Sequence, residues 1–373
     1  MYKIFVMRLY TLTINFIMML VLITIASSCS EKKIDNIEIV TLEDRLLSDS
    51  NLLKTDSIWY PIDSIYAKKF YVYADTILIM ENNKAAGNFL NIYNMHNHQL
   101  IAKLLPFGEG PGELLYAQMH YDGSFMRVVD YIKRTLYNIN IENILNDNSY
   151  IPELIPLSQN YIITTSPVSY GDSIIYVNPF HYVNRQANIV QQPPRLIASS
   201  SKNIEPKMPM DFDYMTFNVG QGYLGANTHL GSIFFASNEN STIEFYSSDL
   251  KPIKKVVGPV SLPEARLSIS GEDGKREVVY KGMLQPEAYR GFTSSADYLF
   301  FLYTGKEVPL DNQKDFKSYI LCFDWKGNFQ KSYSPSSRIY ALSVSATSET
   351  FYATIMSEDG NPKLVKLTHI ENN

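Results

Sequence analysis

From about residue 37 onward, apolar residues occur in short runs separated by Gly, Asn, Asp and Pro. Some runs alternate with polar residues and others are continuously apolar, but all are shorter than an ordinary helix. Short runs bounded by turn residues predict β-strands. The clearest are Thr76–Met80, Phe89–Tyr93, Met126–Asp130, Ile174–Val177, Ile233–Ala236 and Tyr298–Tyr303. Helical periodicity is weak, and we expect helix only at 42–53 and 277–289.

The predicted strands also recur as pairs, each with an apolar strand, a polar turn and a second strand. The pairs align on Tyr93, Tyr137, Tyr246 and Phe323, with gaps of 44, 109 and 77 residues. A propeller blade takes about 40–45 residues, so the gaps correspond to one blade, two blades, and one blade with an insertion. We place that insertion at 262–290 and a degenerate copy of the pair at 174–189.

This pattern predicts an all-β fold, a six-bladed β-propeller of four-stranded antiparallel blades over residues 37–373. Radial repetition protects strand edges that have no helical cover. We expect the N-terminal strand 37–41 to complete the last blade, which ends near 364–367, and so to close the ring. A pair of β-sandwiches is the alternative.

The first residues have the layout of an export signal. Lys3 and Arg8 precede an apolar run at 16–25, which is followed by small residues and Cys29. The run is too short to span a bilayer as a helix, for which about 20 residues are needed. Ala26-Ser-Ser-Cys29 resembles the lipobox of bacterial lipoproteins, so we expect a signal peptide at 1–28, a lipidated tether at 29–36 and an outer-membrane location on either face. An ordinary signal anchor with an incidental cysteine is the alternative.

Composition narrows the classes of partner. With Cys29 lipidated, Cys322 is the only other cysteine, so no disulfide is expected and Cys322 is read as a buried, inert thiol. A net charge of −5 without a basic stripe argues against a nucleic-acid partner. The 27 tyrosines suit the half-buried faces of strands. We expect a monomer that touches the membrane only through its lipid.

Few segments offer chemistry. Gly108-Glu-Gly-Pro-Gly-Glu113 lacks the lysine, the hydroxyl residue and the helix of a phosphate-binding loop. We interpret Gly108, Gly110, Pro111, Gly112 and Glu113 as a tight turn between blades. His96 and His98 fall in a hairpin turn without a nearby carboxylate, and the acidic segments 270–275 and 357–361 read as turns. No catalytic residue, metal site or cofactor is predicted.

Two segments resemble a known family. Leu105–Leu114 contains a glycine-proline-glycine-glutamate signature, and Phe323-Asp-Trp-Lys-Gly-Asn328 forms a clear hairpin. Both resemble the six-bladed, TolB-like propeller lipoproteins of Bacteroides-type bacteria, over roughly residues 37–370. Glu109 departs from that pattern, because the family more often has a basic residue there. The resemblance implies fold and export but no established activity, so it transfers no functional residue.

Two functions stay open from the sequence. The first is a binding module for a protein, peptide or glycan at one end of the ring. The second is a carbohydrate-active hydrolase or lyase with its site in the central channel. Propellers host both, so the side chains that line the channel must decide between them.

Overall fold

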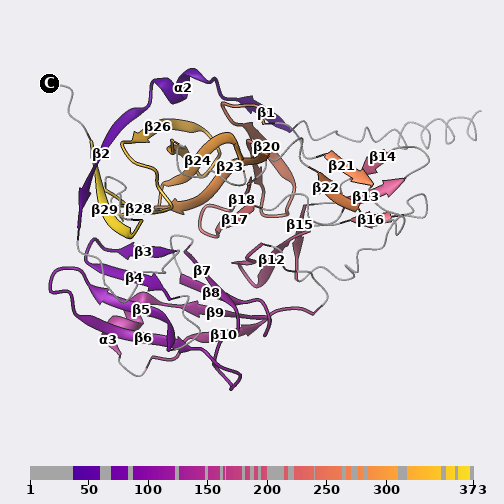
Figure 1. Cartoon of the computed structure of the whole chain (residues 1–373). Helices are drawn as coiled ribbons and strands as arrows, with labels where there is room; N and C mark the ends of the chain where they lie inside the picture. Colours follow the sequence, from indigo (N-terminus) through magenta and orange to yellow (C-terminus); the bar gives the residue numbers. More distant parts are fainter. Residues whose placement is uncertain are drawn as a thin grey trace, which may run out of the picture. The chain divides into compact units, whose positions relative to one another are not determined.

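The structure is a computed structural model. It describes residues 37–58, 69–82, 87–121, 126–147, 150–159, 163, 165–178, 181–184, 189–191, 195–199, 214–216, 222–238, 240–262, 266–269, 276–279, 284–309, 317–345, 350–357 and 360–369. The predicted signal peptide, the tether with Cys29 and the segment 270–275 lie outside the described residues. Nearly all regular structure in them is β-strand (Figure 1). Only two short helices occur among these residues, α2 (Arg45–Ser48) and α3 (Ile141–Asn146). None of the described helices is long and apolar enough to cross a membrane.

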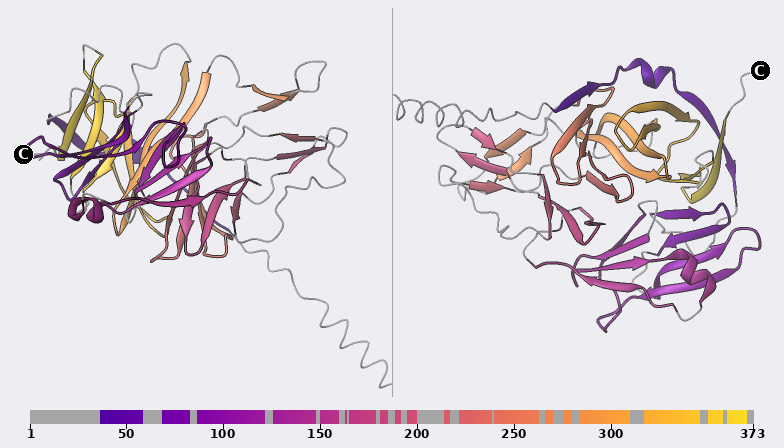
Figure 2. Two further views of the ribbon diagram at one scale, coloured as in Figure 1. Left: turned by 90° about the horizontal axis from the view of Figure 1, so that it is seen from below. Right: turned by 180° about the vertical axis from the view of Figure 1, so that it is seen from behind.

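The strands form six consecutive antiparallel blades, which can be followed in Figures 1 and 2. Blade 1 contains β3 (Phe70–Tyr73), β4 (Ile77–Glu81), β5 (Asn88–Asn94) and β6 (Leu100–Pro106). Blade 2 contains β7 (Ala117–Tyr121), β8 (Met126–Asp130), β9 (Thr135–Ile139) and β10 (Glu153–Pro156). Blade 3 contains three described strands, β11 (Val168–Tyr170), β12 (Ser173–Val177) and β15 (Leu196–Ala198).

The second half of the ring follows the same plan. Blade 4 contains β17 (Gly222–Asn227), β18 (Ser232–Ser237), β19 (Thr242–Tyr246) and β20 (Pro252–Val257). Blade 5 contains β23 (Leu284–Ser294), β24 (Tyr298–Pro309), β25 (Tyr319–Asp324) and β26 (Phe329–Pro335). Blade 6 contains β27 (Ala341–Val344), β28 (Phe351–Met356), β29 (Pro362–His369) and β2 (Asn51–Ser57).

The repeat read from the sequence is confirmed. Tyr93, Tyr137, Tyr246 and Phe323 all lie in the third strand of a blade, namely β5, β9, β19 and β25. The insertion expected at 262–290 contains a separate hairpin of β21 (Arg266–Ile269) and β22 (Arg276–Val279). A second group of added strands, β13 (His181–Asn184), β14 (Ile189–Gln191) and β16 (Tyr214–Thr216), forms its own sheet. In the sequence, β13 and β14 lie between β12 and β15 of blade 3, and β16 lies between blades 3 and 4. The degenerate strand pair expected at 174–189 is therefore wrong, because 174–177 belongs to blade 3 whereas β13 and β14 belong to the added sheet.

An N-terminal strand completes the last blade, as expected, but it is β2 and not the segment 37–41. β2 pairs antiparallel with β29, from Leu53 opposite His369 to Ser57 opposite Val365. Residues 38–41 form β1 (Glu38–Thr41), which instead pairs parallel with β20 of blade 4. Packing explains the difference: Leu53 is 1% exposed within the apolar layer of blades 5 and 6, whereas all of β1 is exposed or half-buried.

Both predicted helices are largely wrong. Within 42–53 only the single turn of α2 is helical, and the chain then enters β2. The stretch 277–289 contributes to β22 and β23 instead. In each case hydrogen bonding to a neighbouring strand outweighs a weak local helical pattern, because most helix stability in proteins comes from tertiary packing.

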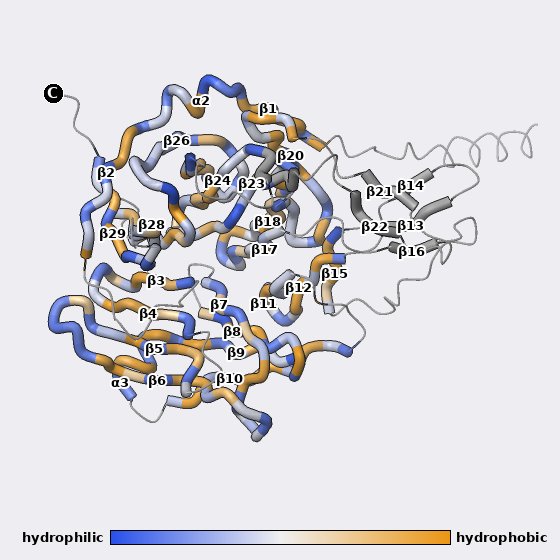
Figure 3. Tube along the Cα trace, in the orientation of Figure 1, coloured by the Kyte–Doolittle hydropathy of each residue, from blue (hydrophilic) through white to orange (hydrophobic). Residues whose placement is uncertain are grey.

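Apolar layers between successive blades form the core (Figure 3). In β4, the side chains of Ile77 and Ile79 pack towards blade 2, while those of Leu78 and Met80 pack towards blade 6. Successive side chains of a strand point to opposite faces, and both faces of a blade are covered. This explains why the second strands of blades read as continuous apolar runs.

Blades 6 and 1 are joined by polar contacts as well as by this apolar layer. The backbone N–H of Val72 donates to Oγ of Ser343 at 3.0 Å, and the Tyr352 hydroxyl donates to Oδ1 of Asp75 at 3.0 Å. Blades far apart in the sequence are therefore neighbours, and the ring is closed by side chains as well as by β2.

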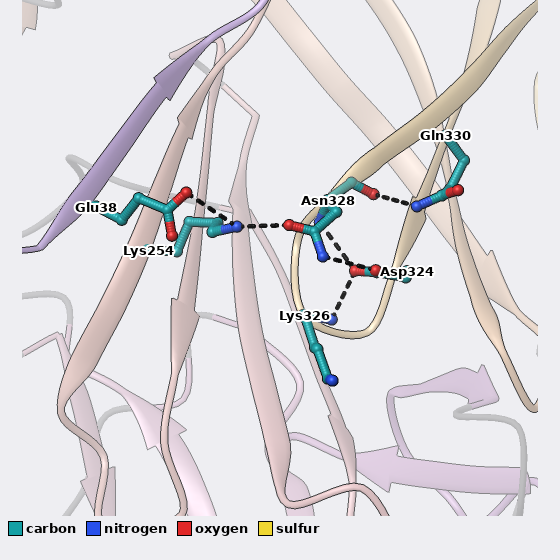
Figure 4. Close-up of polar contacts among 6 residues, drawn as sticks. All are labelled: Glu38, Lys254, Asp324, Lys326, Asn328 and Gln330. Carbon is teal, nitrogen blue, oxygen red and sulfur yellow. Dashed lines mark hydrogen bonds and ion pairs between the residues drawn. The ribbon is translucent and has the colours of Figure 1, made fainter.

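The hairpin between β25 and β26 also links two blades (Figure 4). Oδ1 of Asp324 accepts the backbone N–H groups of Lys326 at 2.9 Å and Asn328 at 2.8 Å. Oδ1 of Asn328 then accepts a hydrogen bond of 2.7 Å from the ammonium of Lys254 on β20. Since Lys254 also pairs with Glu38 at 3.3 Å, a single buried lysine connects blade 4, β1 and the turn of blade 5.

Candidate functional site

The first strands of the blades surround two adjoining cavities. The smaller holds about 160 Å³ and is lined from β3, β7, β17, β23 and β27. The larger holds about 500 Å³ and is lined from β7, β17 and the segment before β11. Lys69, His120 and Tyr223 line both. Because all six blades contribute, the cavities occupy the channel of the propeller, where ligand sites in closed β-folds commonly lie.

The smaller cavity combines aromatic walls with basic groups. Tyr71, Tyr121, Phe292 and Tyr340 line it together with Lys69, His120 and Arg290. The remaining walls include apolar side chains such as Leu302 and Leu342. Low polarity around charged groups strengthens their interactions with a ligand charge.

A chain of hydrogen bonds crosses the larger cavity. The Tyr131 hydroxyl donates to Oε1 of Gln118 at 3.2 Å and shares a hydrogen bond of 2.5 Å with Oγ of Ser166. Ser166 Oγ is also bonded to Nε2 of His120. In the bond between Tyr131 and Ser166 either hydroxyl can donate, and the tautomer of His120 sets whether Nε2 donates to Ser166 or accepts from it.

Burial controls the ionisation of this group. It holds the pKa of His120 well below its ordinary value, and the positive charges of Lys69 and Arg127 lower it further. Burial also lowers the pKa of Lys69, although the negative charge of Glu81 partly opposes this. The pKa of Tyr131 is raised to about 12, again mainly by burial. His120 and Tyr131 are therefore neutral near pH 7.

Two arginines meet at Tyr340, which lines the smaller cavity. The guanidinium carbons of Arg290 and Arg338 lie 5.9 and 5.0 Å from the ring centre of Tyr340, within the range of cation–π contacts. Nε of Arg290 pairs with Oε1 of Glu287 at 3.1 Å, and the Tyr223 hydroxyl donates to the carbonyl of Arg290. The pKa of Arg338 is lowered by burial and by the charge of Arg290.

Several buried polar atoms around the cavities have no hydrogen-bond partner among the described residues. They are Nη1 of Arg290, Oγ1 of Thr165 and Oδ1 of Asn238. Arg290 lines the smaller cavity, and Thr165 and Asn238 line the larger one. Buried polar atoms are nearly always hydrogen-bonded in folded proteins, so these three unpaired atoms beside the cavities are exceptional.

The glycine-rich turn lies outside these cavities. Gly108–Glu113 links β6 to β7, between blades 1 and 2. The Glu113 carboxylate accepts the backbone N–H of Gly110 at 2.6 Å, and Gly112 has φ of +76°. The ammonium of Lys133 donates to the carbonyls of Gly108, Gly110 and Glu113 at 3.0, 2.8 and 2.7 Å. This geometry suits a blade-to-blade link, and a direct test is given in the Discussion.

The other residues singled out in the sequence lie apart from the cavities. His96 and His98 are exposed near the turn between β5 and β6. No group of three metal-ligating side chains occurs among the described residues. Cys322 is buried in β25, and burial raises the pKa of its thiol to about 12. An inert thiol is the consistent interpretation.

Sequence reasoning missed Lys69, His120, Ser166 and Arg290. They are separated by up to more than two hundred residues and carry no shared motif. The available signal is positional: His120 and Arg290 lie in the first strands of their blades, and Lys69 and Ser166 lie just before such strands. A polar residue at the first strand of a predicted blade is therefore a candidate channel residue.

Comparisons with known proteins agree with this architecture. Among solved structures, the chain is similar to a Bacteroides fragilis protein described as exported, with 13% identity, a TM-score of 0.52, and coverage of 90% of this chain and 100% of that one. It is also similar to a DUF4221 family member from Bacteroides vulgatus, with 12% identity, a TM-score of 0.46, and coverage of 86% and 100%. At 13% identity, the likeness to the Bacteroides fragilis structure shows the fold alone. A search of curated proteins finds no match.

The family itself is established by sequence. Residues 62–347 match the family model described as TolB-like 6-blade propeller-like, which spans most of the blades described above. This confirms the family suggested by the Gly108–Glu113 signature and by the hairpin at 323–328. The chain therefore belongs to the TolB-like 6-blade propeller-like family.

Proposed function

We propose that this chain is an exported, lipid-anchored propeller that binds a glycan in its channel cavities. Export and anchoring are supported by the layout of residues 1–29 and by the description of the Bacteroides fragilis structure as an exported protein. Binding is supported by the two cavities, in which aromatic rings stand beside hydrogen-bonding groups. That combination is what recognises a sugar ring, which has an apolar face and a polar edge.

The size of the site favours a glycan over a protein partner. A cavity of about 500 Å³ lies within the range of sites for small molecules, roughly 300–1,000 Å³. A stable protein interface instead buries about 1,200–2,000 Å² of surface. The larger cavity reaches an exposed aromatic side chain, Tyr116, which is 55% exposed and lies 5.9 Å from the ring of Tyr131. A glycan in the larger cavity would contact this ring, which lines it.

Binding without hydrolysis fits the lining better than a glycosidase does. Glycosidases generally use a pair of carboxylates on either side of the bond that they cleave. Among the described residues that line the two cavities, none carries a carboxylate. A lyase, which needs a base and an acid, is the remaining enzymatic hypothesis, with His120 and Tyr131 as candidates. Detection of new unsaturated products from a bound glycan would support the lyase over the binding module.

The binding proposal is tested with the purified protein on a glycan array, followed by calorimetry on the best ligand. Tyr116→Ala should weaken binding several-fold, since an aromatic contact contributes about 0.5–1.5 kcal/mol beyond its buried area. Tyr298→Ala is the matched control, because Tyr298 is also exposed but does not line either cavity. Absence of any glycan ligand, or equal affinities for both variants, would contradict the proposal.

A further inference from the structure

We infer that the smaller cavity is a carboxylate-binding subsite, so that the glycan contains an acidic sugar of the uronic acid class. This inference rests on the proposed glycan binding and specifies its chemistry. Lys69, His120 and Arg290 come from blades 1, 2 and 5 and meet at this one cavity. Because these three side chains come from separate blades, their relative positions depend on the closure of the ring.

The cationic side chains around the cavity outnumber the acidic ones, which favours binding of an anion. Lys69 and Arg290 line it. The charge of Arg127 acts on His120, and the charges of Arg338 and Arg290 act on each other. The acids that act on these groups are Glu81 and Glu287. Like charges held together in a poorly solvated site are unfavourable, and an anion between them removes that cost.

Both of these acids are already engaged by the protein. Oε2 of Glu81 accepts the backbone N–H of Met119 at 3.1 Å, and Glu81 is only 3% exposed. Glu287 pairs with the Nε edge of Arg290. Neither is among the cavity-lining residues, so neither occupies the position of a ligand carboxylate.

Arg290 is oriented for one further anionic contact. Glu287 holds its Nε, and its guanidinium carbon lies 5.9 Å from the ring centre of Tyr340. Its buried Nη1 has no hydrogen-bond partner among the described residues. A guanidinium at the cavity wall whose plane is restrained suits a planar carboxylate, because arginine binds such groups through parallel N–H bonds.

The two cavities divide the ligand between them. The smaller, about 160 Å³, has room for a compact charged group between aromatic walls. The larger, about 500 Å³, has room for adjoining neutral sugars, and its walls include the polar side chains of Gln118, Ser166 and Asn238. Lys69 and Tyr223 border both cavities, so the acidic sugar sits at their junction.

The test compares each acidic oligosaccharide with its own methyl ester. The probes are oligomers of galacturonate, glucuronate and mannuronate, and methyl esterification removes the charge while keeping the sugar backbone. We expect the acid form of at least one to bind about tenfold or more tightly than its ester. Lys69→Met and Arg290→Gln should each lower the ratio of acid to ester affinity several-fold or more, whatever they do to the binding of the ester. Lys103→Met, at an exposed lysine of β6, should keep the preference.

The outcomes separate this inference from the proposed function. Equal binding of acid and ester would overturn the carboxylate subsite but leave glycan binding intact. Tighter binding of a sulfated oligosaccharide, or of a short polyglutamate peptide, would overturn the uronate assignment in favour of that anion. Absence of binding to every glycan would overturn both. Thermal melts of each variant test whether it is folded, and Lys69→Met removes the charge of a half-buried side chain while keeping a chain of similar length.

Discussion

Lys133 is expected to stabilise the link between blades 1 and 2. Its ammonium is half-buried and donates to three carbonyls of the glycine-rich turn, at 2.7–3.0 Å. The carboxylate of Asp130 accepts the backbone N–H of Lys133 at 2.9 Å and that of Leu115 at 2.7 Å. These bonds fix the backbone of Lys133 beside the turn. Lys133→Met keeps the length of the side chain but removes all three bonds.

The magnitude follows from the number and the exposure of these bonds. A hydrogen bond to a charged group contributes about 1.5–3 kcal/mol. The three bonds share one ammonium, and the turn carbonyls of Gly108 and Gly110 are half-buried, so water partly replaces the lost donor. We therefore expect Lys133→Met to lower the free energy of unfolding by about 2–4 kcal/mol, well below the sum of three separate bonds.

Urea denaturation followed by circular dichroism measures this change. For a slope of about 3 kcal/mol per M, the midpoint should fall by about 1 M. The matched control is Lys103→Met, which should stay within about 0.5 kcal/mol of the parent, as exposed positions usually do. If both variants unfold at the same urea concentration, Lys133 does not stabilise the turn. If Lys133→Met unfolds like the parent but no longer binds a glycan, the turn is a functional site and not a structural link.

Four further predictions test the anchor, the turn, the channel and the core. Fatty-acid label should enter the parent and be absent from Cys29→Ala, which should also leave the membrane fraction; equal labelling would refute lipidation. Gly112→Val should lower the free energy of unfolding by about 1–3 kcal/mol, because a branched side chain is strained at φ of +76°, and an unchanged melt would contradict this. Because the pKa of His120 is depressed, the folded state excludes a proton that the unfolded state binds below about pH 6.5. The free energy of unfolding should therefore fall as the pH drops from 7 to 5. In pH-dependent melts His120→Asn should reduce this dependence, whereas the control His96→Asn, at an exposed position, should not. Cys322 should resist thiol reagents at pH 8 until the chain is unfolded, since burial raises its pKa to about 12, and rapid native labelling would show that β25 opens.

Much of the fold was determined locally by the sequence. Runs such as Thr76–Met80 predict strands because alternation, branching and flanking turn residues act over a few residues. The spacing of Tyr93, Tyr137, Tyr246 and Phe323 indicated the blade repeat, since each occupies the same third strand. Glycine at φ of +79° in the β25–β26 hairpin, Gly327, was likewise readable from the turn chemistry of Lys326-Gly-Asn328.

Only the tertiary structure decided which strand closes the ring and which side chains meet in the channel. The sequence predicted a strand at 37–41 and a helix over 42–53, but burial of Leu53 between blades 5 and 6 makes 51–57 the strand that completes the last blade. Lys69, His120 and Arg290 share no local pattern, because each is one polar residue near the first strand of its own blade. Their convergence depends on the closure of all the blades around one axis. Such long-range packing is not encoded in any short window of the chain.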